Sequence, residues 1–125
     1  MVNTPLISVV DDDDSVRESL SGLIRSVGFG ALVFASAEEF LNSNHLRGTR
    51  CLILDVRMPG MNGFELHRQL RATHHDIPVI FITAHGNEVS RLQALKEGAM
   101  DYLYKPFSDE ALLNAIDAAL RLEVI

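Results

Sequence analysis

Four short apolar runs, each followed directly by a polar residue, constrain the fold of this chain more than any other feature of its sequence. The runs cover residues 6–10, 51–54, 79–82 and 102–104, and the polar residues that follow them are Asp11, Asp55, Thr83 and Lys105. Runs of this length, rich in branched and aromatic residues and separated by helical patterns, are typical of buried parallel strands. In an open α/β sheet, ligands bind outside the carboxyl ends of the strands. We therefore expect these polar groups, although far apart in sequence, to share one edge of one sheet.

Helical patterns occupy the intervals between the expected strands. Capping-box patterns predict that helices begin at Ser15 and at Ser36, and Gly28 and Gly98 are typical of residues that end a helix. A further short strand is expected around residues 31–34, and further helices around 64–70, around 87–97 and from 108 onward. Five strands that alternate with five helices predict βαβ units, with helices on both faces of a doubly wound parallel sheet.

The bulk properties of the chain favour one globular domain. A length of 125 residues is enough for a single domain with its own core, and a 47% apolar content is ordinary for such a domain. The net charge of −6 disfavours direct binding to nucleic acid, whose phosphates need a basic surface. No signal-peptide pattern and no bilayer-spanning apolar stretch is visible. With its one cysteine, Cys51, expected as a buried reduced thiol, we expect a cytoplasmic protein without membrane contact.

Three carboxylates are expected to meet at the predicted sheet edge. Asp11 and Asp12 follow the first strand and Asp55 follows a neighbouring strand, whereas Asp13 and Asp14 are assigned to the start of the next helix. As an isolated charge run, residues 11–14 would be typical of a solvated surface. Three carboxylates placed together, however, repel one another unless a cation lies among them. A site with few protein ligands, all of them oxygens, suits Mg²⁺, with Mn²⁺ as an alternative ion.

Thr83 and Lys105 add a hydroxyl donor and a fixed positive charge to the same edge. Each has an ordinary explanation when taken alone, since threonine favours strands and a lysine near a sheet edge is usually solvated. Together with the carboxylates, they supply what the oxygens of a phosphoryl group require. One carboxylate would then be available to attack a phosphorus atom and form an aspartyl phosphate.

The sequence resembles the receiver domains of two-component response regulators, in particular the FixJ-like group. The stretches that carry the resemblance are residues 9–13, 54–63, 81–86 and 98–107, and the Asp-x-x-Met-Pro-x-Met-x-Gly loop at 55–63 is its most specific motif. The match extends over essentially the whole chain, in order. It implies that residues 1–125 form one receiver domain with a flavodoxin-like (βα)5 fold and the strand order 2-1-3-4-5.

The resemblance also implies a role for each residue of the predicted site. Asp55 would be the phosphoacceptor, Asp12 a direct Mg²⁺ ligand, Asp11 a ligand mainly through water, Arg57 a ligand through its backbone carbonyl, Thr83 and Tyr102 the switch pair, and Lys105 the partner of the phosphoryl group. The bond between Lys105 and Pro106 is expected to be cis, which would direct the lysine into the site.

Two further sets of side chains carry hypotheses of their own. Arg57 and His85 are expected to flank the path of the water that hydrolyses the phosphoryl group and so to tune the lifetime of the phosphorylated form; the alternative is that both are solvated. Val89, Leu92 and Tyr104 are expected on the face of the fourth helix and fifth strand, where the resemblance suggests a phosphorylation-dependent homodimer.

The expected donor is a phosphohistidine on a sensor histidine kinase, and the domain is interpreted as a switch rather than an enzyme with turnover. FixJ-like regulators usually carry a C-terminal DNA-binding output domain, so DNA would be contacted only through such a domain; the alternative is a stand-alone receiver. A Mg²⁺-dependent aspartyl-phosphate phosphohydrolase would need a carboxylate where Arg57 stands. A degenerate receiver used as a binding module is disfavoured by the intact site residues, and nucleotide binding by the lack of a glycine-rich loop after the first strand.

Overall fold

Strands and helices alternate strictly along the chain. The computed structural model describes residues 4–122. Its elements are β1 (Leu6–Val10), α1 (Asp14–Ser26), β2 (Gly30–Phe34), α2 (Ala37–Leu41), β3 (Thr49–Asp55), α3 (Gly63–Ala72), β4 (Val79–Thr83), α4 (Glu88–Lys96), β5 (Asp101–Tyr104) and α5 (Asp109–Leu122). None of the helices within this described range has the length and apolar character needed to cross a bilayer.

The strands form one parallel sheet in the order β2-β1-β3-β4-β5, which confirms the order implied by the resemblance. Each crossover between parallel strands contains a helix, as parallel pairing requires. β3 lies at the centre of the sheet, and its last residue, Asp55, pairs with Ile82 of β4. The central strands β3 and β4 are buried along almost their whole length because both of their faces are covered.

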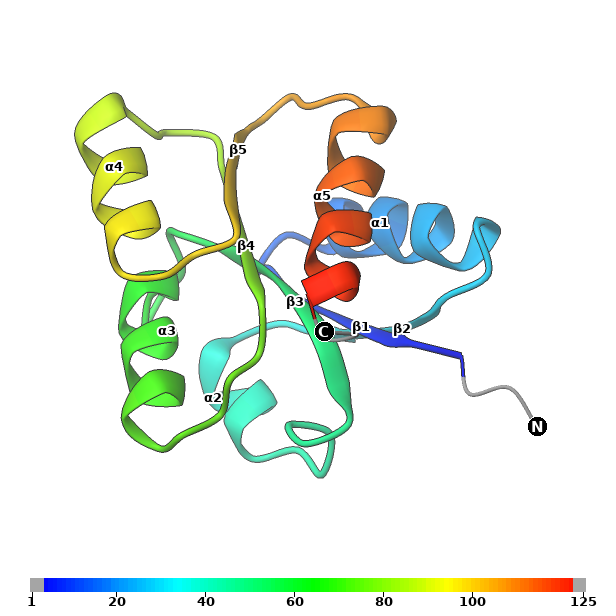
Figure 1. The fold of residues 1–125 in the computed structure, drawn as a ribbon, viewed down its shortest axis with the longest axis horizontal. Helices are drawn as coiled ribbons and strands as arrows, with labels where there is room; N and C mark the ends of the chain where they lie inside the picture. The colour runs from blue at the N-terminus through cyan, green and yellow to red at the C-terminus, as the bar shows by residue number, and fades with distance from the viewer. Residues whose placement is uncertain (1–3, 123–125) are drawn as a thin grey trace.

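Two layers of helices cover the two faces of the sheet (Figure 1). Successive strand residues point to opposite faces, so that Leu52 and Leu54 pack with α2, α3 and α4, whereas Cys51 and Ile53 pack with α1 and α5. Both core clusters are apolar, and Cys51 is buried, as expected. This two-sided packing fixes the strands, and therefore also the loops that leave their carboxyl ends.

The starts of the helices agree with the sequence prediction in part. α1 begins after Asp13, whose carboxylate accepts hydrogen bonds from the backbone N–H groups of Ser15 and Val16, so the predicted cap at Ser15 is wrong by two residues. Ser36 caps α2 as predicted, through a hydrogen bond from the N–H of Glu39. α3 starts with a full capping box that the sequence analysis did not identify: the residues are Asn62 and Glu65.

Candidate functional site

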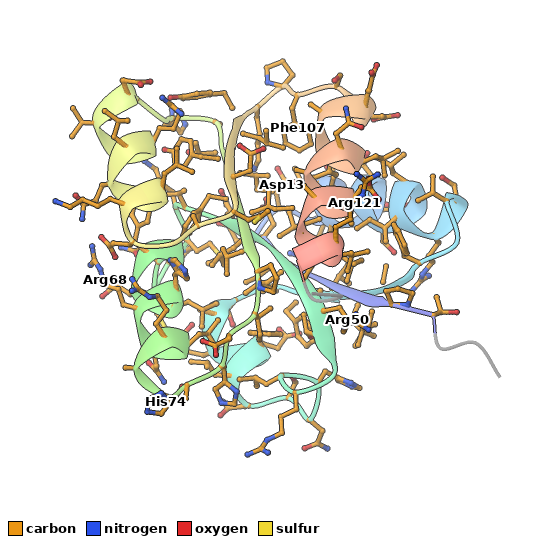
Figure 2. The ribbon with its side chains drawn as sticks, viewed as in Figure 1. Asp13, Arg50, Arg68, His74, Phe107 and Arg121 are labelled. Carbon is orange, nitrogen blue, oxygen red and sulfur yellow. The ribbon has the colours of Figure 1, made fainter. Side chains whose placement is uncertain are left out.

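The carboxyl ends of four strands bring the predicted site residues together. Asp11 follows β1, Asp55 ends β3, Thr83 ends β4 and Lys105 follows β5. The register aligns these ends, because Val10 pairs with Leu54, Asp55 with Ile82 and Thr83 with Tyr104. Parallel strands end at the same edge of a sheet, so four residues from distant parts of the sequence share one small region. Figure 2 shows Asp13 and Phe107, which flank this edge, at the opposite end of the molecule from His74.

Asp11, Asp12 and Asp55 form a compact acidic cluster. Each offers a carboxylate oxygen, and these oxygens lie within 4.8 Å of one another. Asp11 is fully buried and Asp55 is 6% exposed, whereas Asp12 faces solvent. One oxygen of Asp11 accepts a hydrogen bond of 2.9 Å from the N–H of Asp13. The cluster therefore combines one solvated carboxylate with two that are shielded from water.

Lys105 supplies the positive charge that the sequence predicts at this edge. Its Nζ lies 2.9 Å from Oδ2 of Asp11 and 3.7 Å from Oδ1 of Asp55. The Lys105–Pro106 peptide bond is cis, as expected. With both oxygens of Asp11 already hydrogen-bonded, the carboxylate of Asp55 is the buried one with the fewest commitments.

Burial and nearby negative charge together raise the pKa of the central carboxylate. Burial raises the pKa of Asp55 to about 7, the negative charge of Asp11 adds to that increase and Lys105 opposes it. One ammonium group therefore does not compensate three carboxylates at this edge. A divalent cation would restore the balance, and the donor set of carboxylate and carbonyl oxygens fits Mg²⁺ in its chemistry.

The loop after β3 carries the remaining predicted metal ligand. Val56 donates a backbone hydrogen bond to Ile82, and Gly63 donates one back to Val56, which anchors the two ends of the loop beside Asp55. The side chain of Arg57 is exposed and lines an open groove, together with that of His85. The structure thus brings the two predicted rate-tuning side chains to one groove, next to the acidic cluster.

The predicted switch pair lies behind the acidic cluster. Thr83 is buried, and its hydroxyl oxygen accepts a 3.1 Å hydrogen bond from the N–H of His85. Tyr102 is 4% exposed, and its hydroxyl has no hydrogen-bond partner among the described residues. Burial raises the pKa of this hydroxyl. The Tyr102 ring packs edge-on against Tyr104.

Gly86 lies where Thr83, Tyr102 and Tyr104 meet, a position that the sequence alone did not reveal. A Cβ atom at this position would lie 2.6 Å from the methyl group of Thr83, 2.8 Å from the hydroxyl of Tyr102 and 2.7 Å from the ring of Tyr104. Only glycine allows so close an approach of three side chains to the backbone. The glycine three residues after Thr83 can be read in the sequence, but the side chains that surround it are known only from the fold.

Two charged residues near the site were also missed by the sequence analysis. Arg17 in α1 donates a 2.6 Å hydrogen bond to the backbone carbonyl of Asp11 and pairs with Asp14. Glu38 in α2 accepts a 3.0 Å hydrogen bond from the N–H of Met61. Arg17 lies within one helical turn of Asp13 and could have been noticed. Glu38 and Met61 are 23 residues apart, and no local pattern links them.

The three predicted dimer-face residues lie outside the acidic cluster. They are the most exposed large apolar side chains of α4 and β5: Val89 is 79%, Leu92 54% and Tyr104 41% exposed. Tyr104 lies next to the predicted switch pair, because its ring contacts that of Tyr102.

Comparisons with known proteins agree with this geometry. Residues 7–117 match a family model described as the response regulator receiver domain. The response regulator protein TodT of Pseudomonas putida is 48% identical over 117 residues, which are 94% of this chain and 52% of that protein. The transcriptional regulatory protein FixJ of Bradyrhizobium diazoefficiens is 40% identical over 115 residues, which are 92% of this chain and 56% of that protein.

Solved structures show the same likeness. The response regulator StyR superimposes with a TM-score of 0.88 and 48% identity, over 96% of this chain and 61% of that one. A structure of FixJ-N gives a TM-score of 0.84 and 37% identity, over 96% of both chains. The present chain spans about half the length of the curated relatives that it matches.

Proposed function

Because this chain belongs to the family of response regulator receiver domains, we propose that Asp55 is its phosphoacceptor and that a sensor histidine kinase donates the phosphoryl group. The observation that carries the proposal is the position of Lys105 Nζ between Asp11 and Asp55, beside three clustered carboxylates. A buried carboxylate at the end of the central strand, next to a fixed cation, is placed to receive an anionic group.

The transfer needs one nucleophile and several positioned charges. A carboxylate oxygen of Asp55 attacks the phosphorus atom, a new P–O bond forms, the P–N bond to the donor histidine breaks, and the departing imidazole keeps that electron pair. Lys105 stays beside the transferred group and offsets its negative charge. Mg²⁺, or Mn²⁺ in its place, would be held by Asp12, Asp55 and the Arg57 carbonyl, with Asp11 acting through water, and would neutralise phosphoryl oxygens.

The phosphoryl group changes the conformation by giving Thr83 a new partner. The Thr83 hydroxyl now accepts from the N–H of His85, and its own proton is available to donate to a phosphoryl oxygen. Movement of Thr83 changes the packing around Gly86, which Tyr102 and Tyr104 share. Phosphorylation can shift this equilibrium only to the extent that it favours one arrangement over the other. The domain acts as a switch, not as an enzyme with turnover.

The output of this switch has two parts: two phosphorylated copies pair, and a second domain binds DNA. The exposed Val89, Leu92 and Tyr104 form the face through which two phosphorylated copies pair. A C-terminal output domain binds DNA, which is supported by the share of FixJ, a transcriptional regulatory protein, that this chain leaves uncovered. The protein acts in the cytoplasm, where thiols stay reduced, and its one cysteine, Cys51, is a buried free thiol.

The phosphoacceptor is tested by mass spectrometry after incubation with acetyl phosphate and Mg²⁺. We expect the wild-type protein to gain the mass of one phosphoryl group and Asp55→Asn to gain none. Asp76→Asn is the matched control, because Asp76 is exposed in the loop before β4, at the other end of the strands, and it should be labelled like the wild type. Labelling of Asp55→Asn at the wild-type level would contradict the proposal, and multiple turnover of a phosphate ester would indicate a phosphohydrolase instead.

Arg57 and His85 tune how long the phosphoryl group persists. Both side chains are exposed in the groove beside Asp55, where they restrict the approach of water. We expect Arg57→Ala and His85→Ala each to shorten the half-life of the phosphorylated form by about 2- to 10-fold, a modest change in barrier height. The measurement is the loss of the phosphoprotein band over time after the donor is removed. Unchanged half-lives in both variants would show that these side chains are only solvated.

A further inference from the structure

The middle of the loop between β3 and α3 has one hydrogen-bonded anchor. The two ends of this loop are held by the backbone bonds of Val56 and Gly63 and by the capping box at Asn62. Between them, within the described part of the chain, the N–H groups of residues 57–61 make a single hydrogen bond, from Met61 to a carboxylate oxygen of Glu38, at 3.0 Å. That oxygen belongs to another element, α2.

Glu38 also covers the adjacent glycine of the loop. Gly60 has a φ of +76°, in the left-handed region that glycine adopts without strain. A Cβ atom at Gly60 would lie 2.8 Å from the same oxygen of Glu38, so the carboxylate rests directly on the backbone of the turn. The hydrogen bond from Met61 lowers the pKa of Glu38 and thereby favours the charged form that accepts it.

A loop held at this point presents its earlier residues in one orientation. Arg57 lies four residues before Met61 on the same short loop, and its own side chain is exposed. The loop after Arg57 is held at two points, by the buried side chain of Met58 and by the hydrogen bond from Met61 to Glu38. Loss of a group that orients a metal ligand without touching the metal itself typically lowers metal affinity by about 10- to 100-fold. A backbone carbonyl has no side-chain rotamer, so it is aimed only by the conformation of its loop.

We propose that Glu38 is a positioning residue for metal binding: its carboxylate fixes the 57–61 loop so that the Arg57 carbonyl faces the cluster of Asp11, Asp12 and Asp55. The inference rests on the proposed function, because that function gives the carbonyl its role. It assigns to α2, which contributes no residue to the acidic cluster, a part in preparing the site.

The test measures the binding of Mg²⁺ alone to the unphosphorylated protein by isothermal titration calorimetry. Glu38→Ala should weaken binding about 5-fold, somewhat less than is typical for partners that contact a ligand directly. Glu38→Gln keeps an acceptor oxygen and should stay within about 2-fold of the wild type. Glu39→Ala is the matched control: it removes the same charge from the same turn of α2, but the Glu39 side chain faces the N–H of Ala35 and not the loop.

Amide hydrogen exchange of the metal-free protein provides a second readout. The N–H of Met61 should exchange faster in Glu38→Ala and unchanged in Glu39→Ala. If Glu38→Ala binds Mg²⁺ as tightly as the wild type, or if Glu39→Ala weakens binding as much, the inference is wrong while the proposed function stands. If the wild-type protein itself fails to bind Mg²⁺, the proposed function fails and the inference fails with it.

Discussion

At the scale of single residues, Asp55 makes the stability of the metal-free protein depend on pH. Burial and the charge of Asp11 raise its pKa from an ordinary 3.8 to about 7. A carboxyl with a higher pKa in the folded state binds protons more readily there than in the unfolded chain, so acid favours folding. We expect the metal-free protein to lose about 4 kcal/mol of stability as the pH rises from about 4 to about 7, because the folded and unfolded pKa values of Asp55 differ by about three units and each unit is worth about 1.4 kcal/mol. Asp55→Asn should lack most of this loss.

The measurement is denaturant unfolding with a chelator present, at about pH 5 and about pH 8. Asp55→Asn should exceed the wild type in stability mainly at the higher pH, and Asp76→Asn should follow the wild-type dependence. Added Mg²⁺ should stabilise the wild type at the higher pH, since a ligand of the folded state alone favours folding. If Asp55→Asn and the wild type depend equally on pH, Asp55 is not the carboxyl whose raised pKa makes the stability depend on pH.

At the scale of helices and strands, short sequence patterns were sufficient to predict the strands and the polar residues that follow them. The apolar runs and the polar residues that end them are contiguous in sequence, so the sheet edge and its site residues could be predicted. The cap of α1 was predicted two residues too late, because residues 11–15 offer several side chains that can cap a helix. Only the path of the chain after β1 selects Asp13 among them. The contact of Glu38 with Met61 and the packing around Gly86 depend on how distant elements meet, which no local pattern contains.

Among the helices, α4 has the fewest side chains packed in the core. It buries only Ala94, and its C-terminal end is tied to α3 by two hydrogen bonds from Arg68 to Glu97, of 2.8 and 3.0 Å. These bonds lower the pKa of Glu97 to about 2. A helix with one buried side chain and a partly solvated ion pair at one end can shift without disrupting a core. That freedom suits the element next to Thr83 and Tyr102.

At the scale of the whole molecule, phosphorylation of Asp55 at one edge of the sheet should cause two copies to associate through the surface of α4 and β5. Val89, Leu92 and Tyr104 expose apolar area that a second copy would cover, and Tyr104 contacts Tyr102, the proposed switch residue. We expect the beryllofluoride-treated protein to dimerise, and Val89→Asp to weaken that dimerisation by at least about tenfold, or about 1.4 kcal/mol. Val89 lies in the first turn of α4, where an added carboxylate suits the helix dipole, so the helix itself should remain intact.

Val27→Asp controls for the added charge, because Val27 is also exposed (46%) but follows α1, away from the dimer-face residues on α4 and β5. Sedimentation over a range of protein concentrations, with and without beryllofluoride, measures the effect. The control should dimerise like the wild type, because its new carboxylate lies outside the interface. A beryllofluoride-treated wild type that stays monomeric at high concentration would rule out dimerisation as the output of this domain, and equal weakening by both variants would mean that net charge, not the α4–β5 face, governs association.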